Sequence, residues 1–288
     1  MWSSAFSAAR IIVLDAPPLM ALTARFLLAG LIGVALARAL GQSWHLTPAQ
    51  WRATLIFGLC QNALYLGLNF VAMQWVEASL TAIIASTMPL LVALIGWVFL
   101  RERLPWAGIA GLIAGFVGVA VIMGGRFGGE GADPLGMALC LAGALALAVA
   151  TQMVRGAASG GNVLMIVGLQ MLVGAAILIG PALAFETFEV AWSGKLVAAF
   201  LYVTLVPGLA ATWVWFVLVR RIGAVRAATY HFLNPFFGVA VAALVLGEAL
   251  RPLDGVGVVI VMAGILAVQL ARVAPRPPAP APHLPPRA

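Results

Sequence analysis

Long apolar runs separated by short polar segments make up most of this sequence. A run of about 20 mostly apolar residues can cross the roughly 30 Å hydrocarbon core of a bilayer as one helix. The pattern predicts a first apolar helix over residues 1–14, which is too short to span and which we infer to begin inside the membrane. Nine further helices are expected over residues 19–40, 53–73, 80–100, 104–123, 135–154, 163–184, 196–219, 224–246 and 253–271. The predicted fold class is an all-α membrane protein with ten transmembrane helices.

The segment from Glu77 to Met123 recurs 146 positions later without a gap. Pro89 matches Pro235 and Glu102 matches Glu248, so a mid-helix proline is twice followed thirteen residues later by a glutamate. Further matched pairs are Leu104/Leu250, Gly111/Gly257, Gly118/Gly264, Ala78/Ala224 and Ala82/Ala228. Alanine, leucine and glycine match easily by chance in so apolar a chain. The proline and glutamate pairs are harder to dismiss, and they indicate a duplicated unit.

This duplication predicts the domain organisation. Residues 1–123 form a first five-helix repeat with a short first helix, and residues 135–273 form the second repeat. The glycine-rich residues 124–134 are expected to be a flexible linker. Residues 274–288 contain too many prolines for a helix and are expected to be disordered or polyproline-like.

Composition excludes a water-soluble globule and argues against nucleic acid as a partner. Hydrophobic residues make up 64% of the chain and charged residues 9%, whereas a soluble domain carries about a quarter charged residues. The net charge of +7 comes from basic residues scattered singly between apolar runs, as in membrane loops. Cys60 and Cys140 lie in apolar runs without metal-ligand spacing, so neither a metal nor another cofactor is expected.

The charges also predict an orientation. On the expected topology, one side carries eleven basic residues with Glu102 as its single acid, and the other side carries three basic residues and eight acids. The positive-inside rule then puts both termini in the cytoplasm of a multi-pass bacterial inner (plasma) membrane protein. Since five is an odd number of spans, the second repeat must run inverted relative to the first.

Several motifs resemble the EamA-type members of the drug/metabolite transporter superfamily. They are Trp2-Ser3-Ser4-Ala5-Phe6, Pro17-Pro18, Arg25-Phe26, the Pro89 helix ending in Leu100-Arg101-Glu102, the glycine-spaced helix after it, and Pro235 through Gly247-Glu248. The resemblance implies two inverted five-helix repeats around a central cavity and the export of amino acids or other metabolites, with the aromatic amino-acid exporters as one branch. The first helix lacks the upstream half that is usual in the family, so the resemblance says least about the roles of residues near Met1.

Polar side chains inside spans cost free energy, so those present call for an explanation. The candidates for a substrate cavity are Asn62, Tyr65, Asn69, Ser86, Gln152, Trp213, Tyr230, His231 and Asn234. Asn62, Tyr65 and Asn69 are spaced three and four apart, which puts them on one helix face. Hydrogen bonding between helices is the alternative role for this set, and for His231 a neutral packing role competes with proton transfer. Pro89 and Pro235 are expected to be either paired gating bends or static kinks.

The remaining chemistry favours transport of a small neutral or zwitterionic solute. All nine acids lie at predicted helix ends or in loops, which favours downhill export or exchange over strongly coupled pumping. Arg10 and Arg25 are the only basic residues within predicted spans, with Arg25 placed near a membrane face, which disfavours phosphorylated substrates. Amides, hydroxyls, indoles and phenols suit amino acids, including aromatic ones, moved by alternating access.

Other hypotheses about the function are also compatible with the sequence. Lipophilic drugs or sugars are alternative substrates on the same fold. An intramembrane enzyme or a purely structural membrane protein is a third reading, although the sequence lacks HExxH and GxSxG motifs. The expected partners are a small-molecule substrate and the lipid bilayer. A duplicated unit already contains its own partner, which favours a monomer.

Overall fold

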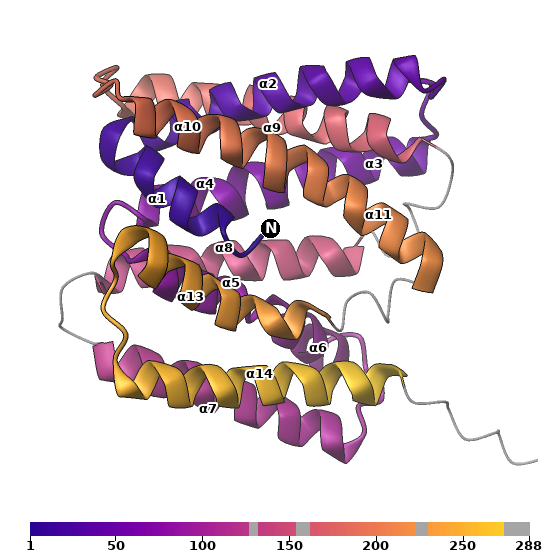
Figure 1. The fold of residues 1–288 in the computed structure, drawn as a ribbon. Coiled ribbons are helices and arrows are strands. Elements are labelled where there is room, and N and C mark those ends of the chain that lie inside the picture. The colour runs from indigo at the N-terminus through magenta and orange to yellow at the C-terminus, as the bar shows by residue number, and fades with distance from the viewer. Residues whose placement is uncertain (127–131, 154–161, 223–229, 274–288) are drawn as a thin grey trace, which may run out of the picture.

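The computed structural model describes residues 1–126, 132–153, 162–222 and 230–273, and within these ranges the chain is helical apart from short connections and one isolated bridge between Val76 and Ala132 (Figure 1). In chain order the elements are α1 (Ala5–Asp15), α2 (Pro18–Ala39), α3 (Pro48–Phe57), η1 (Gly58–Leu66), α4 (Gly67–Ala72), α5 (Ala78–Ala85), α6 (Met88–Val98), α7 (Trp106–Arg126), α8 (Pro134–Met153), α9 (Val163–Phe185), α10 (Gly194–Val203), η2 (Thr204–Ala210), α11 (Ala211–Ile222), η3 (Tyr230–Leu233), α13 (Asn234–Leu246) and α14 (Pro252–Val273).

Several of these elements run on into one another, so the described residues form ten helical rods. The rods that combine elements are α3–η1–α4, α5–α6, α10–η2–α11 and η3–α13. Seven helices in the described part are long and apolar enough to cross a membrane. The first helix is short, as expected, and has 11 residues. The beginning of the predicted helix over 224–246 lies outside the described residues.

Among the helix ends that differ from the prediction, two have identifiable reasons. The third helix begins at Pro48 rather than at residue 53, because Thr47 and Gln50 form a reciprocal capping box over its first turn. Helix α7 continues to Arg126, three residues beyond the expected end at 123. The Arg126 side chain is paired with acids from two other segments, and these contacts hold the last turn of α7 in place.

The observed elements keep the 146-residue offset of the sequence repeat. Four pairs of elements begin 146 positions apart: α3 and α10, η1 and η2, α6 and α13, and α7 and α14. Arg101 and Gly247, also 146 apart, both adopt a left-handed backbone conformation, with φ of 54° and 69°. Arg101 is the single non-glycine residue with positive φ in the described chain. In the described residues the two halves therefore share these four element starts and this left-handed turn.

Helix pairs from different halves form the two outer sides of the bundle. Helices α2 and α9 pack along one side, α7 and α14 pack along the opposite side, and α1, α4, α5, α8 and α13 lie between them (Figure 1). Glycines allow α7 and α14 to touch backbone to backbone. Gly111 lies against Gly264, and Gly118 lies against Gly257. Since the number rises on one helix as it falls on the other, α7 and α14 are antiparallel.

The core is divided into two apolar clusters, and each combines residues from both halves of the chain. One cluster joins α1, α2, α4, α9 and α10 around side chains such as Phe26 and Met171. The other joins α5, α6, α7, α8, α13 and α14 around side chains such as Leu90 and Ile265. The packing units are thus not the same as the sequence repeats.

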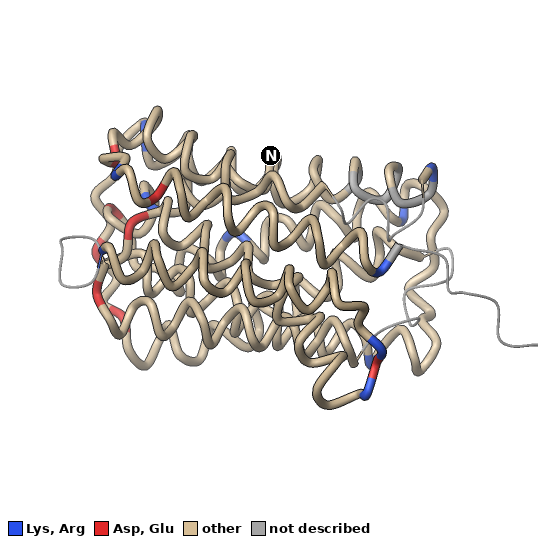
Figure 2. Tube along the Cα trace, turned by 90° about the horizontal axis from the view of Figure 1, so that it is seen from below, with Lys and Arg blue, Asp and Glu red and all other residues tan. Residues whose placement is uncertain are grey.

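Charged residues gather at the two ends of the bundle, and the ends differ in sign (Figure 2). Every described acid except Glu102 lies where the loops after α1, α4, α7, α9 and α13 meet, and we call this the acidic end. The opposite end carries Arg38, Arg52, Arg101 and Arg103 with Glu102, and we call it the basic end.

Candidate functional site

A cavity of about 2090 Å³ lies among helices from both halves of the chain. Its polar lining comes from α2, η1, α4, α6, α8, α11, η3, α13 and α14, together with residues near the N-terminus and the loop before α7. The polar and charged lining residues are Trp2, Ser3, Arg25, Gln61, Asn62, Tyr65, Asn69, Ser86, Trp97, Arg101, Glu102, Arg103, Thr151, Thr212, His231, Asn234, Gln269 and Arg272. A space of this size can hold a metabolite together with water.

Two π-helical segments at matching positions border the cavity. Segment η1 supplies Gln61, Asn62 and Tyr65, and segment η2 supplies Pro207 and Gly208. A π-helical turn inserts one extra residue into the helix, changes the direction of the side chains after it, and is found disproportionately at functional sites. Pro207 lies inside η2, where it removes one backbone donor from the helix.

Three polar residues of the third helix, Asn62, Tyr65 and Asn69, lie along one wall of the cavity. Asn62 and Asn69 are each 1% exposed, and Tyr65 lies between them on the same wall. The Asn62 amide donates to the Gln170 carbonyl at 2.7 Å, and the Asn69 amide donates to the Tyr65 carbonyl at 2.6 Å. Asn69 Oδ1 is buried without a hydrogen-bond partner in the described structure. The Asn62 bond ties the third helix to α9, whereas the Asn69 bond lies within its own helical rod, and both side chains line the cavity.

Residues of the second half and of the N-terminus form a connected polar group on the other wall. The Trp2 and His231 rings are stacked with centroids 5.5 Å apart, and Trp2 Nε1 donates to the Pro207 carbonyl at 3.0 Å. Asn234 Nδ2 lies 3.0 Å from His231 Nδ1, and Ser3 Oγ donates to Asn234 Oδ1 at 3.2 Å. His231 and Asn234 both line the cavity.

The structure places the other candidate cavity residues in different surroundings. Tyr230 does not line the cavity and is 58% exposed, because it begins η3 and its neighbour His231 is the residue that turns inward. Gln152 is also absent from the lining, since its Nε2 donates to the Val92 carbonyl at 2.8 Å. Ser86 lines the cavity, but its hydroxyl donates to the Ala82 carbonyl of its own helix. The Trp213 side chain lies outside the described part of the structure.

The two prolines lie just after helix breaks. Pro89 is in the first turn of α6, after the break at Ser86 and Thr87, and it lines the cavity. Pro235 is in the first turn of α13, after the tighter turn of η3, and it is buried outside the lining. A proline in the first turn loses no intrahelical hydrogen bond, so both positions suit a helix restart.

Sequence reasoning missed Arg25 as a cavity residue. Its side chain is 6% exposed, and it lines the cavity instead of leaving the bundle at a membrane face. Arg10, the other basic residue within a predicted span, lies outside the lining and donates to the Met73 carbonyl. The sequence does contain a signal for Arg25, because an ionisable residue inside a membrane span is by default a candidate for function.

The cavity extends to the basic end of the bundle. The loop that precedes α7 contributes Arg101, Glu102 and Arg103 to the lining, and the last turn of α14 contributes Arg272. Arg272 Nη2 lies 3.9 Å from Glu102 Oε2, and it donates to the Val92 carbonyl at 3.3 Å. A solute in the cavity therefore has a charged rim between it and this end.

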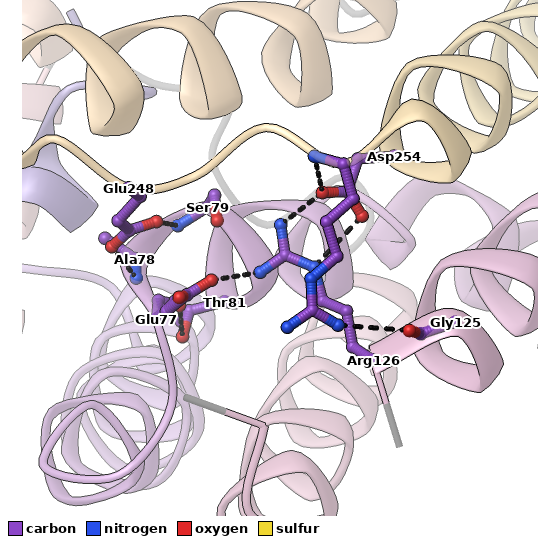
Figure 3. Close-up of polar contacts among 9 residues, drawn as sticks. Glu77, Ala78, Ser79, Thr81, Gly125, Arg126, Glu248 and Asp254 are labelled. Carbon is purple, nitrogen blue, oxygen red and sulfur yellow. Dashed lines mark hydrogen bonds and ion pairs between the residues drawn. The ribbon is translucent and has the colours of Figure 1, made fainter. Parts of the chain in front are cut away.

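At the acidic end, charged contacts between the halves hold the helices together (Figure 3). The Glu248 carboxylate accepts hydrogen bonds from the Ala78 and Ser79 amides at 2.7 and 2.9 Å, and so caps the first turn of α5 from the other half. A carboxylate at a helix N-terminus also interacts favourably with the helix dipole. Glu186 caps α2 in the same way through the Leu19 and Met20 amides.

A buried arginine joins three segments beside this cap (Figure 3). Arg126 donates from Nε and Nη2 to the two Asp254 carboxylate oxygens at 3.0 and 2.6 Å, and its Nη1 is paired with Glu77. Arg126 and Asp254 are 2% and 1% exposed. Burial raises the pKa of Glu77, while Arg126 opposes that shift and Glu248 adds to it. Paired charges therefore link α7, α14 and the loop before α5 at the acidic end.

Known proteins match this chain over most of its length. A Bacillus subtilis (strain 168) protein named Uncharacterized transporter YvbV is 27% identical over 270 residues, which cover 93% of this chain and 88% of the relative. An Escherichia coli (strain K12) protein named Uncharacterized inner membrane transporter YedA is 26% identical over 281 residues, covering 94% of this chain and 88% of the relative. A solved crystal structure matches in fold, with a TM-score of 0.66 at 22% identity over 94% of this chain and 96% of that one.

A family profile matches both halves separately from the linker. The profile of the EamA-like transporter family covers residues 1–124 and 134–270, which include all the cavity-lining residues named above except Arg272 in the last turn of α14. The all-helical fold, the apolar spans and the relatives named as transporters agree with that match. This multi-pass membrane protein is a transporter and belongs to the EamA-like transporter family.

Proposed function

We propose that the protein is an inner-membrane secondary transporter that exports small neutral or zwitterionic metabolites, with amino acids as the favoured class, by alternating access. The observation that carries this proposal is the cavity of about 2090 Å³ between the two apolar clusters. It is lined by amides, hydroxyls and aromatic rings that can bind an amino acid with or without an aromatic side chain.

Inverted repeats are the expected basis for alternation. The antiparallel contact of α7 and α14 supports this part of the proposal. Gly111 is equivalent to Gly257 and Gly118 to Gly264, and the observed contacts join Gly111 to Gly264 and Gly118 to Gly257. Each contact becomes the other when the halves are exchanged, as expected of a two-fold axis in the membrane plane. Two such halves can exchange conformations and so reach inward-open and outward-open states of similar energy.

The two ends of the bundle suggest which state this structure represents. By the positive-inside rule, the basic end, where α14 ends at Val273, faces the cytoplasm. The cavity reaches that end, whereas the paired charges of Arg126, Glu77 and Asp254 close the other. We therefore assign the conformation as inward-open, with Pro89 and Pro235 as the bends at which α5–α6 and η3–α13 change direction during the transition.

The experiment that tests the proposal is transport by the purified protein in liposomes. We expect saturable uptake of a radiolabelled aromatic amino acid, competed by other amino acids, with little change when a pH gradient is imposed. Competition by sugars or lipophilic drugs instead of amino acids would favour the alternative substrate classes. The absence of flux for a broad amino-acid panel would rule out this substrate class.

Two tyrosines provide a matched prediction for the cavity. Tyr65 lines it, whereas Tyr230 is 58% exposed outside it. Tyr65→Phe removes one hydroxyl from the substrate-facing wall and is expected to raise the KM of uptake about two- to tenfold, the value of one hydrogen bond. Tyr230→Phe is the control and should leave the KM unchanged. Equal effects of the two variants would contradict the assigned cavity.

A further inference from the structure

Arg25 differs from the other charged residues of the cavity in its position. Among the described lining residues, the charged ones are Arg25, Arg101, Glu102, Arg103 and Arg272. Four of these belong to the loop before α7 or to the last turn of α14, at the basic end. Arg25 alone lies within a long apolar helix, the eighth residue of α2. It therefore places a positive charge in the interior of the cavity.

The guanidinium of Arg25 has no counter-charge in the described structure. Its Nε is buried without a hydrogen-bond partner, and no described carboxylate or carbonyl accepts a hydrogen bond from it. Its described neighbours are the Phe26 ring, 5.4 Å from Cζ, and the backbone of η2, where a Cβ added to Gly208 would lie 3.8 Å from Nη2. Arg126, by contrast, is paired with two acids, and Arg10 with a carbonyl.

An unpaired buried guanidinium destabilises the protein that contains it, so packing does not explain its presence. A guanidinium offers two parallel donors that match the two oxygens of a carboxylate. We propose that Arg25 binds the carboxylate of the transported solute, so that a single carboxylate group defines the substrate class. This inference rests on the proposed function and refines it, because a carboxylate then becomes the required group and an ammonium an optional one.

The surroundings of Arg25 favour a single negative charge over a phosphate. A phosphate ester carries up to two charges, which proteins bind with several donors at once. The interior lining offers neutral groups for the rest of the solute, including Asn62, Tyr65 and Asn234, and no second cation from a described helix interior. One guanidinium can neutralise one carboxylate. The aromatic and amide side chains around it can then hold the remainder of the molecule.

The test compares carboxylates with their amides. The purified protein in lipid nanodiscs is titrated by calorimetry with phenylalanine, phenylalaninamide and 3-phenylpropionate, and with leucine, leucinamide and 4-methylpentanoate. We expect at least one carboxylate of each set to bind about tenfold or more tightly than the matching amide, as for a charge-assisted hydrogen-bonded pair. In Arg25→Gln this preference should disappear, and Arg25→Lys should keep part of it. The control Arg38→Gln removes an exposed charge from the same helix and should keep all of it.

A melting measurement separates ligand binding from a structural role. Without ligand, Arg25→Gln should melt at the same temperature as the parent protein or higher, because an unpaired buried charge has been removed. A marked fall in melting temperature would overturn the inference. So would the absence of any carboxylate preference in the parent protein, or its survival in Arg25→Gln.

The same data distinguish this inference from the proposed function. Arg25-dependent binding of 3-phenylpropionate or 4-methylpentanoate without any amino-acid flux would support the carboxylate site and contradict amino-acid export. Amino-acid flux that amides and acids inhibit equally would support export and contradict the carboxylate site.

Discussion

Replacing Arg126 with leucine is expected to destabilise the protein by about 3–5 kcal/mol, the usual effect of removing one partner from a buried ion pair. The reason is that Asp254, 1% exposed, would be left without its two charge-assisted hydrogen bonds, and Glu77 without its ion pair. The measurement is thermal unfolding in detergent or nanodiscs. If the variant yields no monodisperse protein, the loss of stability lies at or above the upper end of this range.

A nearby arginine provides the control. Arg251 donates to the Gly125 carbonyl from an exposed position, and Arg251→Leu should change stability by no more than about 0.5 kcal/mol. Equal effects of the two substitutions would contradict the role assigned to the Arg126 cluster.

The loss of stability in Arg126→Leu should depend on pH in a defined direction. Burial already raises the pKa of Glu77, and removing Arg126 takes away an interaction that lowers it. A carboxylate with a raised pKa in the folded state gains stability as the pH falls through that pKa, because the folded state then binds the proton more tightly than the unfolded state. The melting temperature of the variant, relative to the parent, should therefore recover toward acidic pH.

Gly264→Ala is expected to destabilise the protein by about 3 kcal/mol, at the upper end for overpacking, because the new methyl group meets backbone atoms. A Cβ at position 264 would lie 2.5 Å from the Gly115 nitrogen and 2.6 Å from the Gly111 oxygen. A side chain could rotate away from such a clash, but two packed backbones cannot. Helices α7 and α14 would have to separate, and unfolding temperature and solution monodispersity would report this.

The control for this substitution lies on the same helix. At Gly255 nothing is found within 4 Å of an added Cβ, so Gly255→Ala should be neutral or stabilise α14 by up to about 1 kcal/mol through helix propensity. Equal tolerance of Gly264→Ala and Gly255→Ala would contradict the close antiparallel packing of α7 against α14.

Much of this fold could be predicted from the sequence, because its signals are local or repeat. Apolar length located the helices, although the third helix begins at Pro48, five residues before its apolar run, where Thr47 and Gln50 form a capping box. The spacing of Asn62, Tyr65 and Asn69 placed these residues on one face, and all three line the cavity.

Other features depend on contacts that no local pattern contains. Helix α7 extends to Arg126 because the Arg126 side chain donates hydrogen bonds to Asp254, which lies 128 positions later in the sequence. Tyr230 and His231 are adjacent in sequence, and only the turn of η3 decides which one enters the cavity. The π-helical turns of η1 and η2 depend on a one-residue shift in backbone hydrogen bonding, to which hydropathy is insensitive. Arg25 was visible as a charge inside a span, but its isolation from any described acid required the packed structure.

The most direct test of alternating access is a counterflow measurement in proteoliposomes. Vesicles are loaded with a high concentration of unlabelled phenylalanine and diluted into a trace of labelled phenylalanine. A carrier that exposes its cavity to one side at a time should accumulate label transiently above the external concentration, and Arg126→Lys or other folded variants can be compared in the same assay. Label that only equilibrates, at a rate indifferent to the solute inside, would indicate a pore. No entry of label for phenylalanine or for any amino acid tested would contradict the proposed transport itself.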